Sequence, residues 1–429
     1  MNVFGELALH GGQALAKLLI HPLYYAGLLI VVVQYYRQMQ LERKLFHTRL
    51  HAVAGRTWRA IGWGWLGGIF ASLLMAFVGA AITPFAVLIL WIASLLLFLF
   101  RIRFLCLAYA VGAVGTGQAV LAAFPQVSEA EGFGDLLRPF MELNVPALLA
   151  IVAILHFVEA LYVRFQGRQA AMPLFCESKR GKIVGGYLLR EFWPVPLFLV
   201  VPWDGGSPMA LPWTPLFGAD LWADGWTIAP FPVIIGFSAL TMTRLPGEKA
   251  RQSFRMLTAY SAVLLLMALS AYVWPQLAAV ASLSCIVLHE AIIRLGRWDE
   301  ARRGARFVHG PQGLTILAVL PNSAAAELGL AAGEIVHKVN GVKVRTKEEL
   351  HRALQLNPAF CKLEIINLEG HSKFVQRAIY SGEHHQLGIV LAPDDQALYY
   401  VEEREGNLFS YLRKGLRGLL SARNHSQGM

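Results

Sequence analysis

The sequence predicts an α-helical polytopic membrane domain of eight or nine spans, followed by a small cytoplasmic domain with a β-sheet and two helices. The chain has 429 residues, of which 56% are hydrophobic and only 15% charged, whereas soluble proteins are about one quarter charged. The apolar excess lies in the first three hundred residues, and short alternating segments replace it from about Arg306. We therefore expect a membrane domain at 1–300, a soluble domain at 305–393 and a basic tail at 398–429.

Stretches long enough to span a bilayer, which takes about 20 mostly apolar residues, account for the first part. Nine qualify: 15–36, 60–82, 84–100, 104–124, 144–163, 183–203, 226–243, 257–273 and 277–293. The first is interrupted at His21-Pro22. The stretch at 183–203 is the weakest, because it contains Arg190, Glu191 and three prolines. It is expected to be a broken, re-entrant or interfacial helix if it is not a span.

The charges of the connecting loops predict the orientation. The loops 37–59, 164–190 and 244–256 are basic, as is the short turn with Arg101 and Arg103, whereas 125–143 and 204–225 are acidic. Cytoplasmic loops of membrane proteins carry the excess of Lys and Arg, so we expect the basic loops and the C-terminal domain inside the cell. The net charge of +10 fits this arrangement. No basic face with stacking aromatics is present, so no nucleic-acid partner is expected.

Glycines recur within two of the stretches. They are Gly62, Gly64, Gly67 and Gly68 in the second and Gly112, Gly115 and Gly117 in the fourth. Small residues let helix backbones approach closely in lipid. We interpret both groups as packing surfaces, with a lined transport path as the alternative.

Ionisable residues inside the stretches are the candidates for chemistry. His156 and Glu159 share one helix face at i, i+3 spacing, and His289-Glu290 lies near the cytoplasmic end of the last stretch. A packing or interfacial role is favoured for each pair. A proton relay through His156 and Glu159 in a solute transporter is the alternative, although the spans show no inverted-repeat hydropathy.

Catalytic and metal-binding motifs are not found. Ile293 stands where an H-E-x-x-H zinc motif beginning at His289 would need its second histidine. The G-x-G-D letters that end at Asp135 fall in an acidic loop rather than in a span. Neither a P-loop nor a G-x-S-x-G nucleophile elbow occurs. We expect no catalytic residue, no metal site and no cofactor.

The four cysteines are Cys106, Cys176, Cys285 and Cys361. They form no C-x-x-C pair, and none has a histidine at metal-ligand spacing in the sequence. They are interpreted as buried thiols in a reducing compartment.

The soluble domain has a regular order of elements. A strand at 314–319 is followed by a turn, a short helix at 324–328 ended by Gly329, and a strand at 335–339. Asn340-Gly341 predicts a hairpin. Thr346 and Glu349 form a capping box that opens a helix to about 356, and further strands are expected near 362–367, 373–378 and 387–391.

The run GLTILAVLPNSAAAELGLAAGEIVHKVNGVKV, from Gly313 to Val344, resembles a PDZ domain of the bacterial arrangement, with Glu334 where Asp is commoner. The resemblance implies a small β-barrel-like sheet and a groove in which an extended peptide adds to a strand edge. It places the groove residues at Gly313, Leu314, Thr315, Ile316 and Leu317, with Leu350 and Leu354 on the facing helix. A terminal carboxylate or an internal turn would meet the amides of Gly313 and Leu314. That Leu350 and Leu354 are simply core residues is the alternative.

The tail carries an amphipathic pattern. Leu408, Phe409, Leu412, Leu416, Leu419 and Leu420 recur at helical spacing among basic residues. A short helix on the inner leaflet and a helix docked on the PDZ domain are both consistent with this pattern.

The combination of a polytopic region, one PDZ domain and no protease motif resembles the MinJ family of cell-division topology factors. The stretch His21-Pro22-Leu23-Tyr24-Tyr25 and the motif of Glu42-Arg43-Lys44, Phe46-His47 and Arg49 look similar to that family's beginning. The resemblance implies a non-enzymatic scaffold that links a DivIVA-like coiled-coil protein to a MinD-like inhibitor and contacts divisome components. It implies a multi-pass protein enriched at septum and poles, and leaves self-association open. The alternative is a PDZ-containing intramembrane protease or protease regulator.

Overall fold

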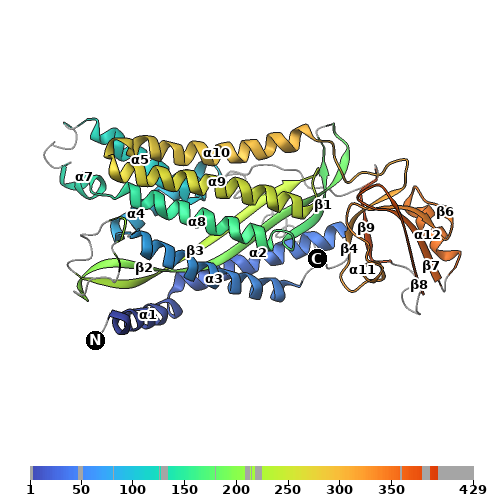
Figure 1. Ribbon diagram of the computed structural model, residues 1–429, viewed down its shortest axis with the longest axis horizontal. Coiled ribbons are helices and arrows are strands. Elements are labelled where there is room, and N and C mark those ends of the chain that lie inside the picture. Colours follow the sequence, from blue (N-terminus) through green and yellow to red (C-terminus); the bar gives the residue numbers. More distant parts are fainter. Residues whose placement is uncertain are drawn as a thin grey trace, which may run out of the picture.

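The computed structural model describes residues 3–46, 52–80, 82–124, 126, 134–178, 180–207, 213, 215–217, 225–357, 360–378 and 387–394. The expected tail at 398–429 lies outside this part of the chain, and so does the glycine at 132 that begins the G-x-G-D letters. Helices form most of the N-terminal region, and a small β-rich domain lies at one end of it (Figure 1).

The helices of the N-terminal region follow the expected stretches in part. They are α1 (Val3–Leu19), α2 (Pro22–Phe46), α3 (Val53–Val78), α4 (Pro84–Phe100), η1 (Ile102–Leu105), α5 (Leu107–Ala122), α7 (Gly134–Met141), α8 (Val145–Gln166), α9 (Pro246–Val273), η3 (Pro275–Leu277) and α10 (Ala278–Arg302).

Within the described residues, four helical segments are long and apolar enough to cross a membrane: α3, α8, α9 and η3 with α10. A fifth candidate is the pair α1 and α2, which bends by 56° at the predicted His21-Pro22 interruption. The helices α4 and α5 are shorter. The expected count of eight or nine spans is therefore not confirmed.

The expected spans at 183–203 and 226–243 are wrong as helices, because both segments are β-strands. β2 (Ile183–Ser207) and β3 (Trp226–Thr241) pair antiparallel from Tyr187↔Thr241 to Pro202↔Trp226. β1 (Ala171–Glu177) pairs with the beginning of β2. Figure 1 shows this ribbon running lengthwise through the helices, starting near the C-terminal domain.

Proline spacing gives the physical reason for the strands. Pro194 and Pro196 in β2 stand two residues apart, as do Pro230 and Pro232 in β3. The backbone nitrogens of each pair therefore face the same edge of their strand. Pro196 and Pro232 lie directly opposite each other, and neither has an N–H, so this is a non-hydrogen-bonded position of the ladder. The prolines thus remove no ladder bond, whereas one proline inside a helix costs about 3 kcal/mol.

Glycines of α3 let this helix lie directly on the outer edge of β2. A Cβ at Gly64 or Gly68 would clash with the carbonyl oxygens of Pro194 and Pro196, respectively. A Cβ at Gly67 would clash with the hydroxyl of Tyr162 on α8. The predicted packing role of these glycines is therefore confirmed, but two of the three pack against a strand rather than a helix.

Polar side chains of α2 and α3 form hydrogen bonds with backbone groups along the same edge. Ser72 Oγ accepts a hydrogen bond from the amide N–H of Phe198 at 2.8 Å. The Tyr35 hydroxyl, which bonds to the Glu191 carboxylate, also lies 3.2 Å from the carbonyl oxygen of Phe192. Backbone groups in an apolar environment need such partners, because an unpaired group costs several kcal/mol in a bilayer.

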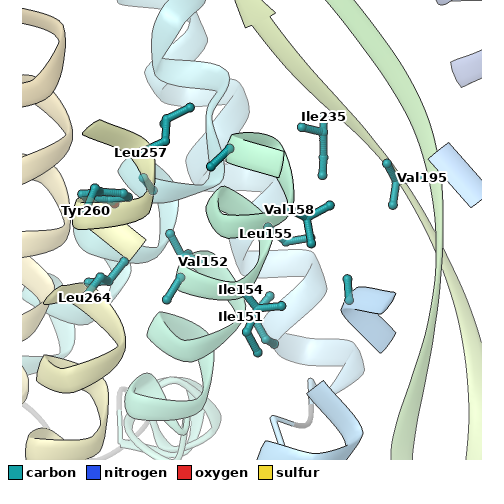
Figure 2. Close-up of a cluster of buried hydrophobic side chains, with 14 of the residues drawn as sticks. Ile151, Val152, Ile154, Leu155, Val158, Val195, Ile235, Leu257, Tyr260 and Leu264 are labelled. Carbon is teal, nitrogen blue, oxygen red and sulfur yellow. The ribbon is translucent and has the colours of Figure 1, made fainter. Parts of the chain in front are cut away.

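The helix α8 forms the centre of the bundle. Figure 2 shows its residues Ile151, Val152, Ile154, Leu155 and Val158 between the β-ribbon on one side and α9 on the other. The ribbon contributes Val195 and Ile235, and α9 contributes Leu257, Tyr260 and Leu264. Because α8 is apolar on all faces and buried over most of its length, it is surrounded by protein rather than exposed on one face.

A buried arginine joins the ends of α2, α3 and β2. Arg56 is 5% exposed and lies 3.4 Å from Glu191 and 4.0 Å from Glu42. It also donates to the carbonyl oxygen of Ala170 at 3.0 Å and to Gln38 Oε1 at 3.3 Å. This network explains how charged Glu191 is accommodated in a largely apolar segment.

The C-terminal domain has the predicted elements: β4 (Leu314–Val319), α11 (Ala324–Glu327), β5 (Ile335–Val339), β6 (Val342–Lys343), α12 (Lys347–Gln355), β7 (Phe360–Ile366), β8 (Ser372–Ala378) and β9 (Ile389–Leu391). The strand order is β8-β7-β5-β4-β9, and β6 pairs with β5. The capping box of Thr346 and Glu349 is present at the start of α12. Cys361 is buried, as expected, and burial raises the pKa of its thiol to about 11.

Substitution Gly68→Leu tests the contact between α3 and β2. We expect it to lower the free energy of unfolding in detergent by about 1–3 kcal/mol, because the side chain has no space beside the ribbon. The matched control is Gly62→Leu, since nothing lies within 4 Å of a Cβ at that position. Equal thermal stability of the two variants would contradict the close approach.

Substitution Arg56→Met tests the buried charge network. Removing the guanidinium takes this cation away from buried Glu42 and partly buried Glu191, and breaking a buried pair costs about 3–5 kcal/mol. Arg59→Met on the same helix is the control. Within the described residues, Arg59 donates its hydrogen bond to the exposed side chain of Gln169. A melting temperature of Arg56→Met as high as that of Arg59→Met would show that the network contributes little.

Candidate functional site

The predicted peptide-binding strand is not at the edge of the sheet. β4, which holds Leu314, Thr315, Ile316 and Leu317, lies between β5 and β9. All four residues are buried. The expectation that this strand offers its edge to a peptide is therefore wrong, because the segment ending in β9 already pairs with it.

The edge strand beside α12 is β9. Gly388 accepts from the amide of Leu320, and the amide of Ala392 donates to Thr315. These two even-numbered residues thus face β4, and strand alternation directs the backbone groups of Ile389 and Leu391 to the other side. β9 therefore offers a short open edge for strand addition.

A groove of about 270 Å³ lies between β9 and α12. Leu350 and Leu354 of α12 line it, as the resemblance implied, together with residues 387–391. Phe46, at the end of α2, lines it as well. Because Leu350 and Leu354 also pack on the domain core, the two interpretations of these leucines are compatible.

Cationic and polar groups lie around this groove. Lys347 and His351 line it from α12, and Lys347 forms a 3.0 Å ion pair with Asp394. His309 accepts from the amide of Thr315 at 3.2 Å. Burial, and then the nearby Lys347 charge, lower the pKa of His309.

The C-terminal domain is attached to the ribbon by backbone hydrogen bonds. The amide of Gly185 donates to Phe307 and the amide of Arg306 donates to Met242, both at 2.9 Å. The Tyr187 hydroxyl donates to the carbonyl oxygen of Leu317. These bonds hold the groove at the end of the bundle where the basic loops lie.

Beneath the domain lies a basic cavity of about 970 Å³. Its lining includes Arg56, Arg59, Arg168 and Arg251, with Glu248 as the acidic member. Three of the basic loops that predict a cytoplasmic orientation, 37–59, 164–190 and 244–256, thus meet at one end of the bundle, next to the C-terminal domain.

A second cluster lies inside the helical bundle. Cys106, between η1 and α5, has its Sγ 3.4 Å from Nε2 of His156 on α8 and 3.7 Å from Nε2 of His289 on α10. The two imidazole rings meet edge to face at 5.3 Å. The sequence identified both histidines, but as separate pairs, and it assigned Cys106 no histidine partner. The structure brings the three together.

Further side chains fix this cluster in place. His156 Nδ1 lies 2.8 Å from the carbonyl oxygen of Val152. His289 Nδ1 lies 3.1 Å from the hydroxyl of Tyr109, which donates to Glu290 at 2.6 Å. Arg103 forms a 3.1 Å ion pair with the same carboxylate.

The turn with Arg101 and Arg103 is therefore not placed as expected for a cytoplasmic loop. It lies beside His156, ten residues before α8 ends at Gln166, which corresponds to about 15 Å along the helix. The short helices α4 and α5 explain this position. Pairing with Glu290 explains how the Arg103 charge is tolerated there.

Glu159 and His156, both described, are joined by no hydrogen bond or ion pair. Instead, Glu159 lines a cavity of about 330 Å³ together with Cys106 and His156. The remaining cysteines, Cys176, Cys285 and Cys361, are free and buried, in agreement with the expectation. Sequence spacing could not have found the cluster, because its members are 50 and 133 residues apart.

Comparison with known proteins agrees with both parts of the structure. Residues 315–366 match the PDZ domain family. The chain is 29% identical over 380 residues to the cell division topological determinant MinJ of Bacillus subtilis strain 168, which covers 88% of this chain and 94% of that protein. It is 26% identical over 268 residues to a probable cell division topological determinant MinJ of Lacticaseibacillus paracasei, covering 60% of this chain and 68% of that protein.

No solved structure matches the chain. The similarity to the Bacillus protein extends over the helical bundle, the β-ribbon and the PDZ domain alike, since it covers most of both chains. The chain thus resembles the cell division topological determinant MinJ over most of its length, and it combines apolar helices with a PDZ domain.

Proposed function

We propose that this protein is a non-enzymatic membrane scaffold of cell division that holds partner proteins at the cytoplasmic face through its PDZ groove. The similarity to MinJ over 94% of that protein's length is the observation that carries this proposal. A topological determinant of division acts by fixing where other proteins are located. A scaffold that does this needs an anchor and a binding surface. The helical bundle supplies the first and the C-terminal domain the second.

The proposed anchor is a multi-pass bundle with its basic end in the cytoplasm. The helices that are long enough to span and the β-ribbon lie roughly along the same axis (Figure 1). The arginines of the cavity beneath the PDZ domain follow the positive-inside rule. In this orientation the groove faces the cytoplasm, where soluble division proteins are accessible.

The proposed binding mode is strand addition to β9. An extended segment would pair with the free backbone groups of Ile389 and Leu391, and its side chains would contact Leu350 and Leu354. A carboxylate of an acidic or carboxyl-terminal segment would compete with Asp394 for Lys347 at the rim. By resemblance to the MinJ family, the partners are a DivIVA-like coiled-coil protein, a MinD-like inhibitor and divisome components, and the protein is enriched at septum and poles.

The proposed function predicts a specific cellular behaviour. In the native host, a fluorescent fusion of the protein should concentrate at division sites and poles, and its deletion should give filamentous cells or displaced septa. Cross-linking in cells should recover the DivIVA-like or MinD-like protein. An even membrane distribution with normal division would contradict the proposal.

The groove is tested by one leucine substitution with a matched control. Leu354→Gln should weaken the binding of a captured partner about tenfold or more, since it removes an apolar anchor from the groove. Leu356→Gln changes a residue that is 67% exposed at the end of the same helix and does not line the groove, and should leave binding unchanged. Affinity is measured with the full-length protein in detergent or nanodiscs, and melting temperatures confirm that both variants are folded. Equal affinities of the two variants would exclude this groove as the binding surface.

A further inference from the structure

We propose that Cys106, His156 and His289 form a zinc-binding site inside the helical bundle. This inference is independent of the proposed function. It rests on three potential ligand atoms that lie within 4.8 Å of one another. The three residues come from different elements, the η1–α5 junction, α8 and α10, so a bound ion would join these elements together.

The distances agree with tetrahedral zinc coordination. Zinc binds a cysteine sulfur at about 2.3 Å and a histidine nitrogen at about 2.0–2.1 Å, and at the tetrahedral angle these bonds separate sulfur and nitrogen by about 3.6 Å. The two observed Sγ–Nε2 distances are 3.4 and 3.7 Å. The potential ligand atoms of the two histidines also lie within 4.8 Å of each other.

Hydrogen bonds fix both imidazoles in the tautomer that a metal requires. His156 Nδ1 can only donate to the carbonyl oxygen of Val152. Tyr109 uses its own proton in the bond to Glu290, so its oxygen accepts from His289 Nδ1. With the proton on Nδ1 in each ring, both Nε2 atoms direct a lone pair at Cys106.

A hydrogen-bonded cluster without an ion would be incomplete. The thiol of Cys106 has one proton and can donate to only one of the two Nε2 atoms. Within the described residues, Cys106 Sγ is the polar partner found at both of these nitrogens. One buried acceptor would therefore remain unsatisfied, which is costly, whereas a cation accepts all three lone pairs together.

The surroundings of the cluster match those of known types of metal site. A ligating histidine commonly donates its second N–H to a carboxylate or carbonyl group. His156 donates to a carbonyl, and His289 is linked through Tyr109 to Glu290. A zinc ion with one thiolate and two neutral imidazoles carries one net positive charge, and the carboxylate of Glu159 in the adjoining cavity can balance it.

The ligand types select the metal. Sulfur and imidazole donors suit zinc and similar transition metals, while magnesium and calcium require oxygen ligands. Three protein ligands leave the fourth position open. The cavity that Glu159 lines with Cys106 and His156 provides space for this carboxylate or a water molecule there.

The test uses the full-length protein, purified in detergent with a tag that lacks histidine, stripped with a chelator, loaded with Zn²⁺ and desalted. Elemental analysis should find about one zinc ion per chain. Cys106→Ser and His289→Gln should each reduce the bound zinc at least tenfold. The control Cys285→Ser should retain it, because Cys285 is a buried thiol on α10 that instead donates to the carbonyl oxygen of Ala108 at 3.3 Å. Glu290→Gln should weaken the affinity about 10–100-fold, as expected for a group that orients a ligand.

Cobalt substitution gives a readout that does not depend on the stability of a variant. Co²⁺ bound to the unmodified protein should show a thiolate-to-cobalt charge-transfer band and the intense visible bands of tetrahedral coordination. Absence of both bands, or a wild-type zinc content no higher than that of Cys106→Ser, would overturn the proposal. Equal loss of zinc in Cys285→Ser would likewise overturn it, because Cys106 would not be the specific ligand.

Discussion

The structure depends on satisfying the backbone hydrogen bonds of a β-ribbon that runs among apolar helices. A sheet edge in such surroundings needs a partner for every N–H and C=O group. Prolines remove donors along the edges, and Ser72 and Tyr35 pair with groups that remain. The glycines of α3 allow that helix to lie against β2 closely enough for these contacts. The positions of α2, α3 and α8 follow from this arrangement.

The ribbon also connects the bundle to the PDZ domain. Its beginning is hydrogen-bonded to Phe307 and Leu317, so the PDZ domain is held against the end where the basic residues gather. A strand that runs along the bundle carries the chain from one end to the other, as a helix would, so the next loop lies at the opposite end. The basic loops 37–59, 164–190 and 244–256 therefore meet at one end of the bundle, although two of the expected helices are strands. On our proposal, the groove at β9 is oriented toward the cytoplasm by the same connection.

Much of the PDZ domain could be predicted from local signals, since the capping box of Thr346, the Asn340-Gly341 hairpin and the strand boundaries depend on neighbouring residues. The β-ribbon could not be recognised from hydropathy, which counts apolar residues regardless of their period. The i, i+2 spacing of Pro194 and Pro196 was the available signal. The edge position of β9 depends on which strands pair across the domain, and the cluster of Cys106 with two histidines depends on packing between distant segments. Neither leaves a pattern in a local window.

Cysteine cross-linking along the ribbon tests the central claim most directly. The paired positions Val195 with Val233, and Leu199 with Ala229, are changed to cysteine in the full-length protein in membranes, oxidised with iodine and mapped by mass spectrometry. Directly paired residues have Cα atoms about 5.5 Å apart or less, so both pairs should form disulfides. The offset pair Val195 with Ala229, about 13 Å apart along the strands, should not. Cross-linking of the offset pair without the two registered pairs would contradict a β-ribbon in this protein.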